Sequence, residues 1–147
     1  MTFERFVRFL LIASLAVLVG GTPGLARSDA EPAPVLVTAK LVEIPSKFPP
    51  DDLYDYAYVM RYEVMGGPLD KKSIFVAHYK PRQPRAKIKD KMKDQVGGKL
   101  RSFSEGDVHK LKLTADLKKI WKGPLVDEFA ATDAKSVRYW CLEVDPN

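Results

Sequence analysis

With 147 residues, 46% of them hydrophobic, a net charge of +5 and one cysteine, the chain is long enough for one domain with its own core. A single cysteine excludes an internal disulfide. The sequence has no glycine-rich nucleotide loop, His-Glu-x-x-His, Cys-x-x-Cys or Gly-x-Ser-x-Gly motif, and only two histidines. We therefore expect no metal and no cofactor, and the sequence favours a binding role over catalysis.

The first 30 residues have the parts of an export signal. Arg5 and Arg8 make a basic start, and an apolar run over residues 9–19 is followed by glycines and a proline. The run is shorter than the roughly 20 residues of a helix that crosses a bilayer. We therefore expect a signal peptide, cut after Ala26 or Ala30, and a periplasmic or secreted protein. The expected organisation is a signal peptide over 1–26, a flexible leader over 27–34 and one domain over 35–147.

Two strands are expected at the start of the domain. The first covers residues 35–44 and is ended by Pro45. The second covers residues 54–65, where alternation puts six residues on one side: Tyr54, Tyr56, Tyr58, Met60, Tyr62 and Val64. A period of two predicts one buried face. These tyrosines also suit a stacking surface for sugars or bases, and a core face is the favoured interpretation.

A hairpin and a helix are expected next. Residues 73–79 predict a third strand, joined to the second by a short glycine-containing loop. Pro84 is a favourable helix start, and Ile88, Met92 and Val96 then recur every fourth residue before a pair of glycines. This spacing predicts a short helix between the third and fourth strands.

The last third of the chain supplies two more strands. The fourth is expected over residues 108–114 and the fifth over residues 137–144. Between them lies a long connection, residues 115–136, which has room for one helical turn around Leu117. The fold class is therefore mainly β.

The order of these elements resembles the OB-fold, a five-stranded, partly open barrel with a helix between strands three and four. The glycine turn at residues 103–108, which leads into Leu113, is similar to the turn that often starts strand four in such barrels. The resemblance covers most of residues 35–147 and is one of element order alone. It implies a β-barrel whose loops surround a binding face.

Charge is distributed unevenly along the chain. Residues 27–70 carry 4 basic and 8 acidic side chains, residues 71–122 carry 16 and 5, and residues 123–147 carry 2 and 5. A basic block of this kind attracts phosphate, sulfate or carboxylate polymers, and salt weakens the attraction. It also suits a solvated surface that complements the acidic segments of the same protein.

The best candidate ligand site lies at the start of the basic block. A loop stiffened by two prolines carries arginines beside an aromatic residue, and lysines follow. The predicted ligand-binding residues are Tyr79, Arg82, Arg85, Lys89 and Lys93. The two arginines are equally suited to pairing with the nearby carboxylates Asp51, Asp52 or Asp55.

His78, His109 and Cys141 have side chains that suit zinc or copper, and the barrel would put them on three neighbouring strands. Leu111 and Leu113 place His109 on an apolar face. An apolar face of Trp140, Leu142 and Val144 would point Cys141 to the other side of the sheet. The sequence therefore predicts no metal site and a buried, unreactive Cys141.

Three functions remain. The leading hypothesis is an exported, non-enzymatic accessory module that engages an anionic polysaccharide or an envelope protein through its basic region, with nucleic acid disfavoured by export. The second is a small hydrolase using Asp51, Asp52 or Asp55 with His78. The third is a structural subunit that uses exposed aromatics of residues 117–129 as an interface.

Overall fold

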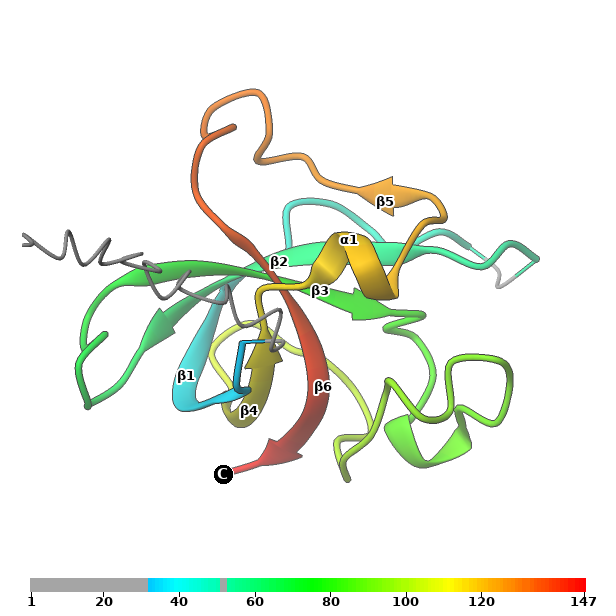
Figure 1. The fold of residues 1–147 in the computed structure, drawn as a ribbon, viewed down its shortest axis with the longest axis horizontal. Coiled ribbons are helices and arrows are strands. Elements are labelled where there is room, and N and C mark those ends of the chain that lie inside the picture. Colours follow the sequence, from blue (N-terminus) through cyan, green and yellow to red (C-terminus); the bar gives the residue numbers. More distant parts are fainter. Residues whose placement is uncertain (1–31, 51–52) are drawn as a thin grey trace, which may run out of the picture.

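Six strands form one mixed sheet in the computed structural model, which describes residues 32–50 and 53–147 (Figure 1). The strands are β1 (Val35–Glu43), β2 (Ala57–Val64), β3 (Ser73–Tyr79), β4 (Val108–Thr114), β5 (Leu125–Val126) and β6 (Arg138–Pro146). The expected mainly-β class is confirmed, and β3 and β4 have the bounds that were predicted. The expected signal peptide and its cleavage sites lie outside the described residues.

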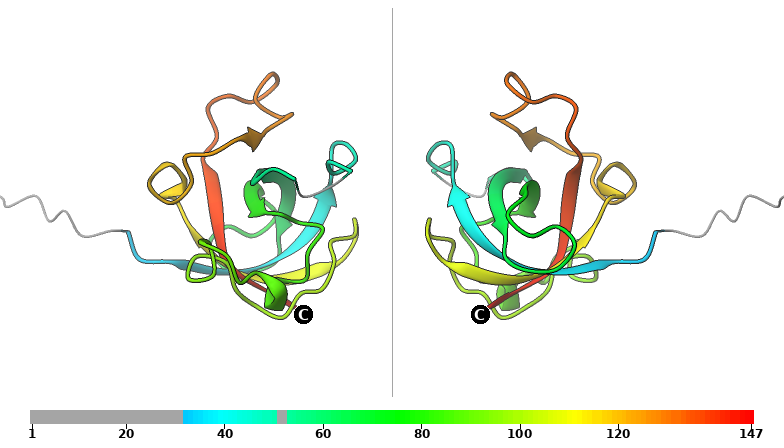
Figure 2. Two further views of the ribbon diagram at one scale, coloured as in Figure 1. Left: turned by 90° about the vertical axis from the view of Figure 1, so that its right-hand side faces the viewer. Right: turned by 90° about the vertical axis from the view of Figure 1, so that its left-hand side faces the viewer.

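The sheet has the order β1-β4-β6-β3-β2-β5, and β1 also pairs with β2. The β3–β6 and β2–β5 pairs are parallel and the others are antiparallel. The β2–β3 hairpin is confirmed, and β6 lies between β3 and β4, so His78, Cys141 and His109 stand on three neighbouring strands. Side views show how strongly the strands curve (Figure 2).

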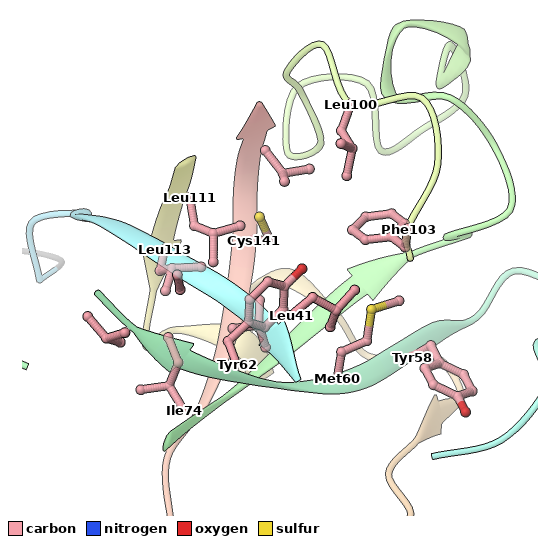
Figure 3. Close-up of a cluster of buried hydrophobic side chains, with 14 of the residues drawn as sticks. Leu41, Tyr58, Met60, Tyr62, Ile74, Leu100, Phe103, Leu111, Leu113 and Cys141 are labelled. Carbon is pink, nitrogen blue, oxygen red and sulfur yellow. The ribbon is translucent and has the colours of Figure 1, made fainter. Parts of the chain in front are cut away.

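Apolar side chains gather on both sides of the sheet. The first cluster includes Tyr58, Met60 and Tyr62, together with Leu111 and Leu113 from β4 (Figure 3). The predicted core face of β2 is therefore confirmed, although Tyr54 precedes the strand and is exposed.

The opposite face of β2 is buried too, which the alternating pattern does not predict. Ala57 and Val59 belong to a second cluster with Leu117, Trp121 and Phe129. The connection between β4 and β6 therefore covers this face. The expectation that aromatics of residues 117–129 are exposed is wrong, because Trp121 and Phe129 pack against the sheet.

A bulge corrects the predicted faces of β6. Lys112 pairs with Glu143 and Leu113 with Cys141, so Leu142 is an extra residue on its strand. Cys141 and Val144 consequently join the first cluster, while Trp140 and Leu142 face the second. The prediction that Trp140, Leu142 and Val144 share a face is wrong, because the extra residue shifts the alternation.

The helix predicted between the third and fourth strands is also absent from the described residues. A single 3₁₀ turn, η1 (Arg85–Lys87), stands in its place, and the α-helix of the fold is α1 (Leu117–Ile120), one turn between β4 and β5. Backbone groups that a helix would use internally are bonded to β6 instead: Gly97 N–H donates to Leu142 O, and Val144 N–H donates to Gly97 O. No described helix has the length and apolar character needed to cross a membrane.

Candidate functional site

A basic loop, residues 82–101, connects the end of β3 to the approach to β4 and is held against the sheet by apolar anchors. Ile88, Met92, Val96 and Leu100 are buried at intervals of four residues. The four-residue spacing therefore reflects burial of these side chains, although the backbone that carries them is mostly irregular and not helical. Exposed cations stand between the anchors: Lys87, Lys89, Lys91, Lys93, Lys99 and Arg101.

The basic loop is also fixed to β6 by its backbone. Lys99 and Leu100 both donate to the carbonyl of Val144 at 3.1 Å. Gly98 allows this contact, since its φ is +103° and a Cβ there would lie 2.1 Å from Val144 O. The backbone that carries the exposed cations is therefore fixed both by the buried anchors and by hydrogen bonds to β6.

The structure divides the five predicted ligand residues into two groups. Arg82, Lys89 and Lys93 are exposed on the basic loop, and Arg82 Nη1 donates to Pro49 O at 3.1 Å. Tyr79 is buried and its hydroxyl donates to Asp90 Oδ2 at 2.8 Å. Arg85 is only 3% exposed, so it faces the interior rather than a ligand in solvent.

Arg85 binds main-chain oxygens. Its Nη1 donates to Tyr79 O at 2.8 Å, and its Nη2 donates to Lys80 O at 2.7 Å and Gln83 O at 2.9 Å. Burial lowers the pKa of Arg85 to about 10, so the guanidinium stays charged at neutral pH. This arginine closes the tight turn that leads from β3 into the basic loop.

An ion-pair group joins the start of β2 to the basic loop. Asp55 contacts Lys80 Nζ at 2.8 Å and Lys91 Nζ at 2.9 Å, and Asp90 lies 3.7 Å from Lys80 Nζ. Hydrogen bonds from Lys80 and then Lys91 hold the pKa of Asp55 well below its usual range. Asp55 therefore pairs with lysines rather than with the arginines proposed from the sequence, and Asp51 and Asp52 lie outside the described residues.

Two histidines meet inside the first cluster. The Tyr62 hydroxyl lies 3.1 Å from His78 Nε2 and 3.2 Å from His109 Nδ1, and we call these three residues the relay. The Phe103 ring packs against both imidazoles, with centroid distances of 4.5 Å to His78 and 5.8 Å to His109. The sequence pointed to both histidines but not to Tyr62, which the alternation of β2 identified only as a core residue.

Burial keeps the relay neutral. It holds the pKa of His78 well below its usual value, and the positive charge of Arg85 acts in the same direction. Burial also lowers the pKa of His109 and raises that of Tyr62. His78 Nδ1 and His109 Nε2 are buried without a hydrogen-bond partner among the described residues.

Among the described residues, Cys141 is not a reactive thiol, no metal cluster forms, and Asp55 and His78 are not in contact. Cys141 is buried, its Sγ donates to Glu143 O at 3.2 Å, and burial raises its pKa. Residues 32–50 and 53–147 contain no group of three or more His, Cys, Asp or Glu side chains that could hold a metal ion. For the expected hydrolase, Asp55 contacts lysines at the surface while His78 contacts Tyr62 and Phe103 inside, so no contact described here joins them.

The chain matches no protein-family model, no curated protein and no solved structure.

Proposed function

We propose that this protein is an exported, non-enzymatic binding module whose basic loop holds an anionic polysaccharide of the cell envelope. The observation that carries the proposal is the construction of the loop: buried anchors fix its backbone while cations between them face solvent. A fixed backbone keeps the charges together without the entropic cost of ordering a flexible segment on binding. Several fixed cations raise the local potential enough to concentrate a polyanion.

The apolar surface supports an electrostatic ligand rather than an apolar one. The exposed large hydrophobic side chains of the described residues all lie outside the basic loop: Val35, Leu36, Leu53, Tyr54, Met65, Leu125 and Val137. Lysine heads are strongly hydrated point charges, so a lysine-dominated site should bind through charge and release its ligand in salt.

We also infer that the sheet closes into a five-stranded OB-type barrel, to which β5 is an addition. This inference is supported by β1, which pairs with β4 on one side and with β2 on the other. The five strands are then hydrogen-bonded in a closed cycle, in the order β1, β2, β3, β6 and β4.

Export is part of the proposal and has its own test. The basic start and apolar run of the first 30 residues support it. N-terminal sequencing of the native protein from separated cell fractions should give a chain that begins after Ala26 or Ala30, in the fraction outside the cytoplasm. A cytosolic chain that begins at Met1 would rule out an envelope ligand.

The binding proposal is tested by salt elution from a sulfated polysaccharide column. We compare the variant K87Q/K89Q/K93Q, which removes three exposed charges from the basic loop, with K72Q/K118Q/K135Q, which removes three exposed charges elsewhere. Both variants have the same net charge, so a local site predicts a lower elution salt for the loop variant. Equal elution would mean that only net charge matters, and no retention of the unmodified protein at low salt would redirect the search to an envelope protein partner.

A further inference from the structure

The relay has a limited capacity for protons because it is built around a single hydroxyl. The Tyr62 hydroxyl can donate to one imidazole while it accepts from the other. With two neutral histidines, the hydroxyl therefore has both a hydrogen-bond acceptor and a donor. One added proton can be accommodated: the imidazole that already donates to Tyr62 takes it on its free nitrogen, and the other imidazole takes it if Tyr62 reverses its direction and the first histidine changes tautomer. With two added protons, both imidazoles would donate to the Tyr62 oxygen, and the hydroxyl hydrogen would lose its acceptor.

The surroundings of the relay supply little compensation for positive charge. Arg85 from the basic loop places a buried guanidinium near His78 and Tyr62, and each histidine also lies in the field of the other. Cys141 on β6 and Tyr56 before β2 are neutral neighbours when protonated. Among the described residues, the acidic side chain whose charge acts on a relay histidine is Asp107, which precedes β4 and raises the pKa of His109.

Phe103 connects the relay to the basic loop. It follows the loop in sequence, packs on both imidazole rings and lies 5.3 Å from the Arg85 guanidinium carbon. Leu100 and Phe103 together cover one end of the first cluster (Figure 3). A change in charge on the histidines therefore acts directly on Phe103, which packs on both rings, and on Arg85, whose charge lies near His78.

We propose that the relay is an acid-sensitive latch: while it is neutral it seats Phe103 and Arg85, and when both histidines are protonated it releases residues 82–103 from the sheet. The strands stay paired because long backbone ladders join them. The loop has no strand ladder: it is attached through its apolar anchors, a few backbone bonds to β6 and side-chain contacts such as Lys91 with Asp55, Tyr79 with Asp90 and Trp140 Nε1 with Gln95 O. The effect of release on polysaccharide binding rests on the function proposed above, whereas the release itself does not.

Hydrogen exchange measured by mass spectrometry tests the latch on the unmodified protein. Rates at about pH 7.5 and about pH 5, corrected for intrinsic exchange, should show a rise of about tenfold or more in residues 82–103, with β2 and β3 unchanged. Unchanged exchange in the loop overturns the proposal. Equal acceleration in loop and strands also overturns it, because that pattern is global unfolding.

Two variants assign the effect to the histidines. H78Q/H109Q has no titrating side chain in the relay and should lose the acid-induced exchange, whereas acid release that persists in it contradicts the latch. If the double variant does not fold, NMR titration of the unmodified protein replaces it, and imidazole and loop signals should change over one pH range. Y62F keeps both histidines but removes the shared hydroxyl, so its loop should open at higher pH.

Polysaccharide retention at constant ionic strength separates the latch from the proposed function. Retention that changes together with loop exchange supports both. If the loop is released but the protein is not retained at either pH, the latch proposal stands and the polysaccharide proposal is wrong. If the protein is retained at both pH values but the loop is not released, the binding proposal stands and the latch proposal is wrong.

Discussion

Arg85 shows how a residue that looks like a ligand contact can be a structural one. Its sequence setting, between two prolines and a run of lysines, is that of an anion-binding arginine. In the structure its guanidinium donates hydrogen bonds to three main-chain oxygens of the turn after β3. Lys80 O also accepts from Gln83 N–H, so the arginine adds a charged donor to a turn that the backbone already forms.

Replacing Arg85 should therefore reduce stability. R85M removes hydrogen bonds from a charged donor to carbonyls, and we expect the free energy of unfolding to fall by about 3 kcal/mol. R85K keeps the charge but cannot reach three oxygens with one ammonium, so it should recover only part of the loss. Urea denaturation measures both, and an R85M variant as stable as the unmodified protein would contradict the structural role.

Two glycines with similar backbone angles provide a second test. Gly98 has φ +103° and no room for a Cβ against Val144, whereas Gly106 has φ +93° and nothing within 4 Å of a Cβ. G106A should cost about 1–2 kcal/mol from backbone conformation alone. G98A should cost clearly more, because the basic loop must also move away from β6. Equal losses in the two variants would show that the contact with Val144 is unimportant.

At the level of elements, the strands were predictable because burial leaves a period of two in the sequence. Residues 73–79 and 108–114 have the predicted strand bounds, and the apolar repeat of Ile88, Met92 and Val96 falls on residues that are buried. That this segment is irregular rather than helical could not be predicted, because its backbone hydrogen bonds go to β6, which is far away in the sequence. The bulge at Leu142 could not be predicted either, since it depends on register against β4.

The candidate site was predictable only where it lies at the surface. Local charge marked Arg82, Lys89 and Lys93, and the structure leaves them exposed. The contacts of Asp55 with Lys80 and of Tyr62 with His109 join residues that are 25 and 47 positions apart, and no local pattern carries such information. The first contact follows from the register of the β2–β3 hairpin, whereas the second requires β1 to pair with both β2 and β4.

The connection between β4 and β6 is the element that covers the outer face of β2 and β3. Trp121 stacks on Trp140 at 6.0 Å between centroids, meets the Tyr79 ring at 5.3 Å and donates from Nε1 to Pro124 O. W121A should lower the free energy of unfolding by about 3–5 kcal/mol. W121F keeps a ring and should lose less than half as much. Urea denaturation of the two variants checks this, and equal small losses would mean that the connection does not stabilise the sheet.

For the whole molecule, the neutral buried histidines and the carboxylates paired with lysines set the response to acid. His78 and His109 have lowered pKa values in the folded protein and bind protons near pH 6.5 when unfolded. The unfolded state therefore holds more protons below about pH 6.5, and stability there rises with pH. Asp55 and Asp90 also have lowered pKa values, so their contribution is lost only as pH falls below about 4.

The free energy of unfolding should accordingly be flat from about pH 8 to pH 7 and then fall, by up to about 1.4 kcal/mol per pH unit for each histidine. Urea denaturation at a series of pH values measures the slope, and H78Q/H109Q should stay flat to about pH 5. The latch adds a further feature, because once residues 82–103 are released the folded state also takes up protons and the slope must flatten. A slope that continues unchanged to the carboxylate range would show that the histidines stay neutral until the sheet itself unfolds.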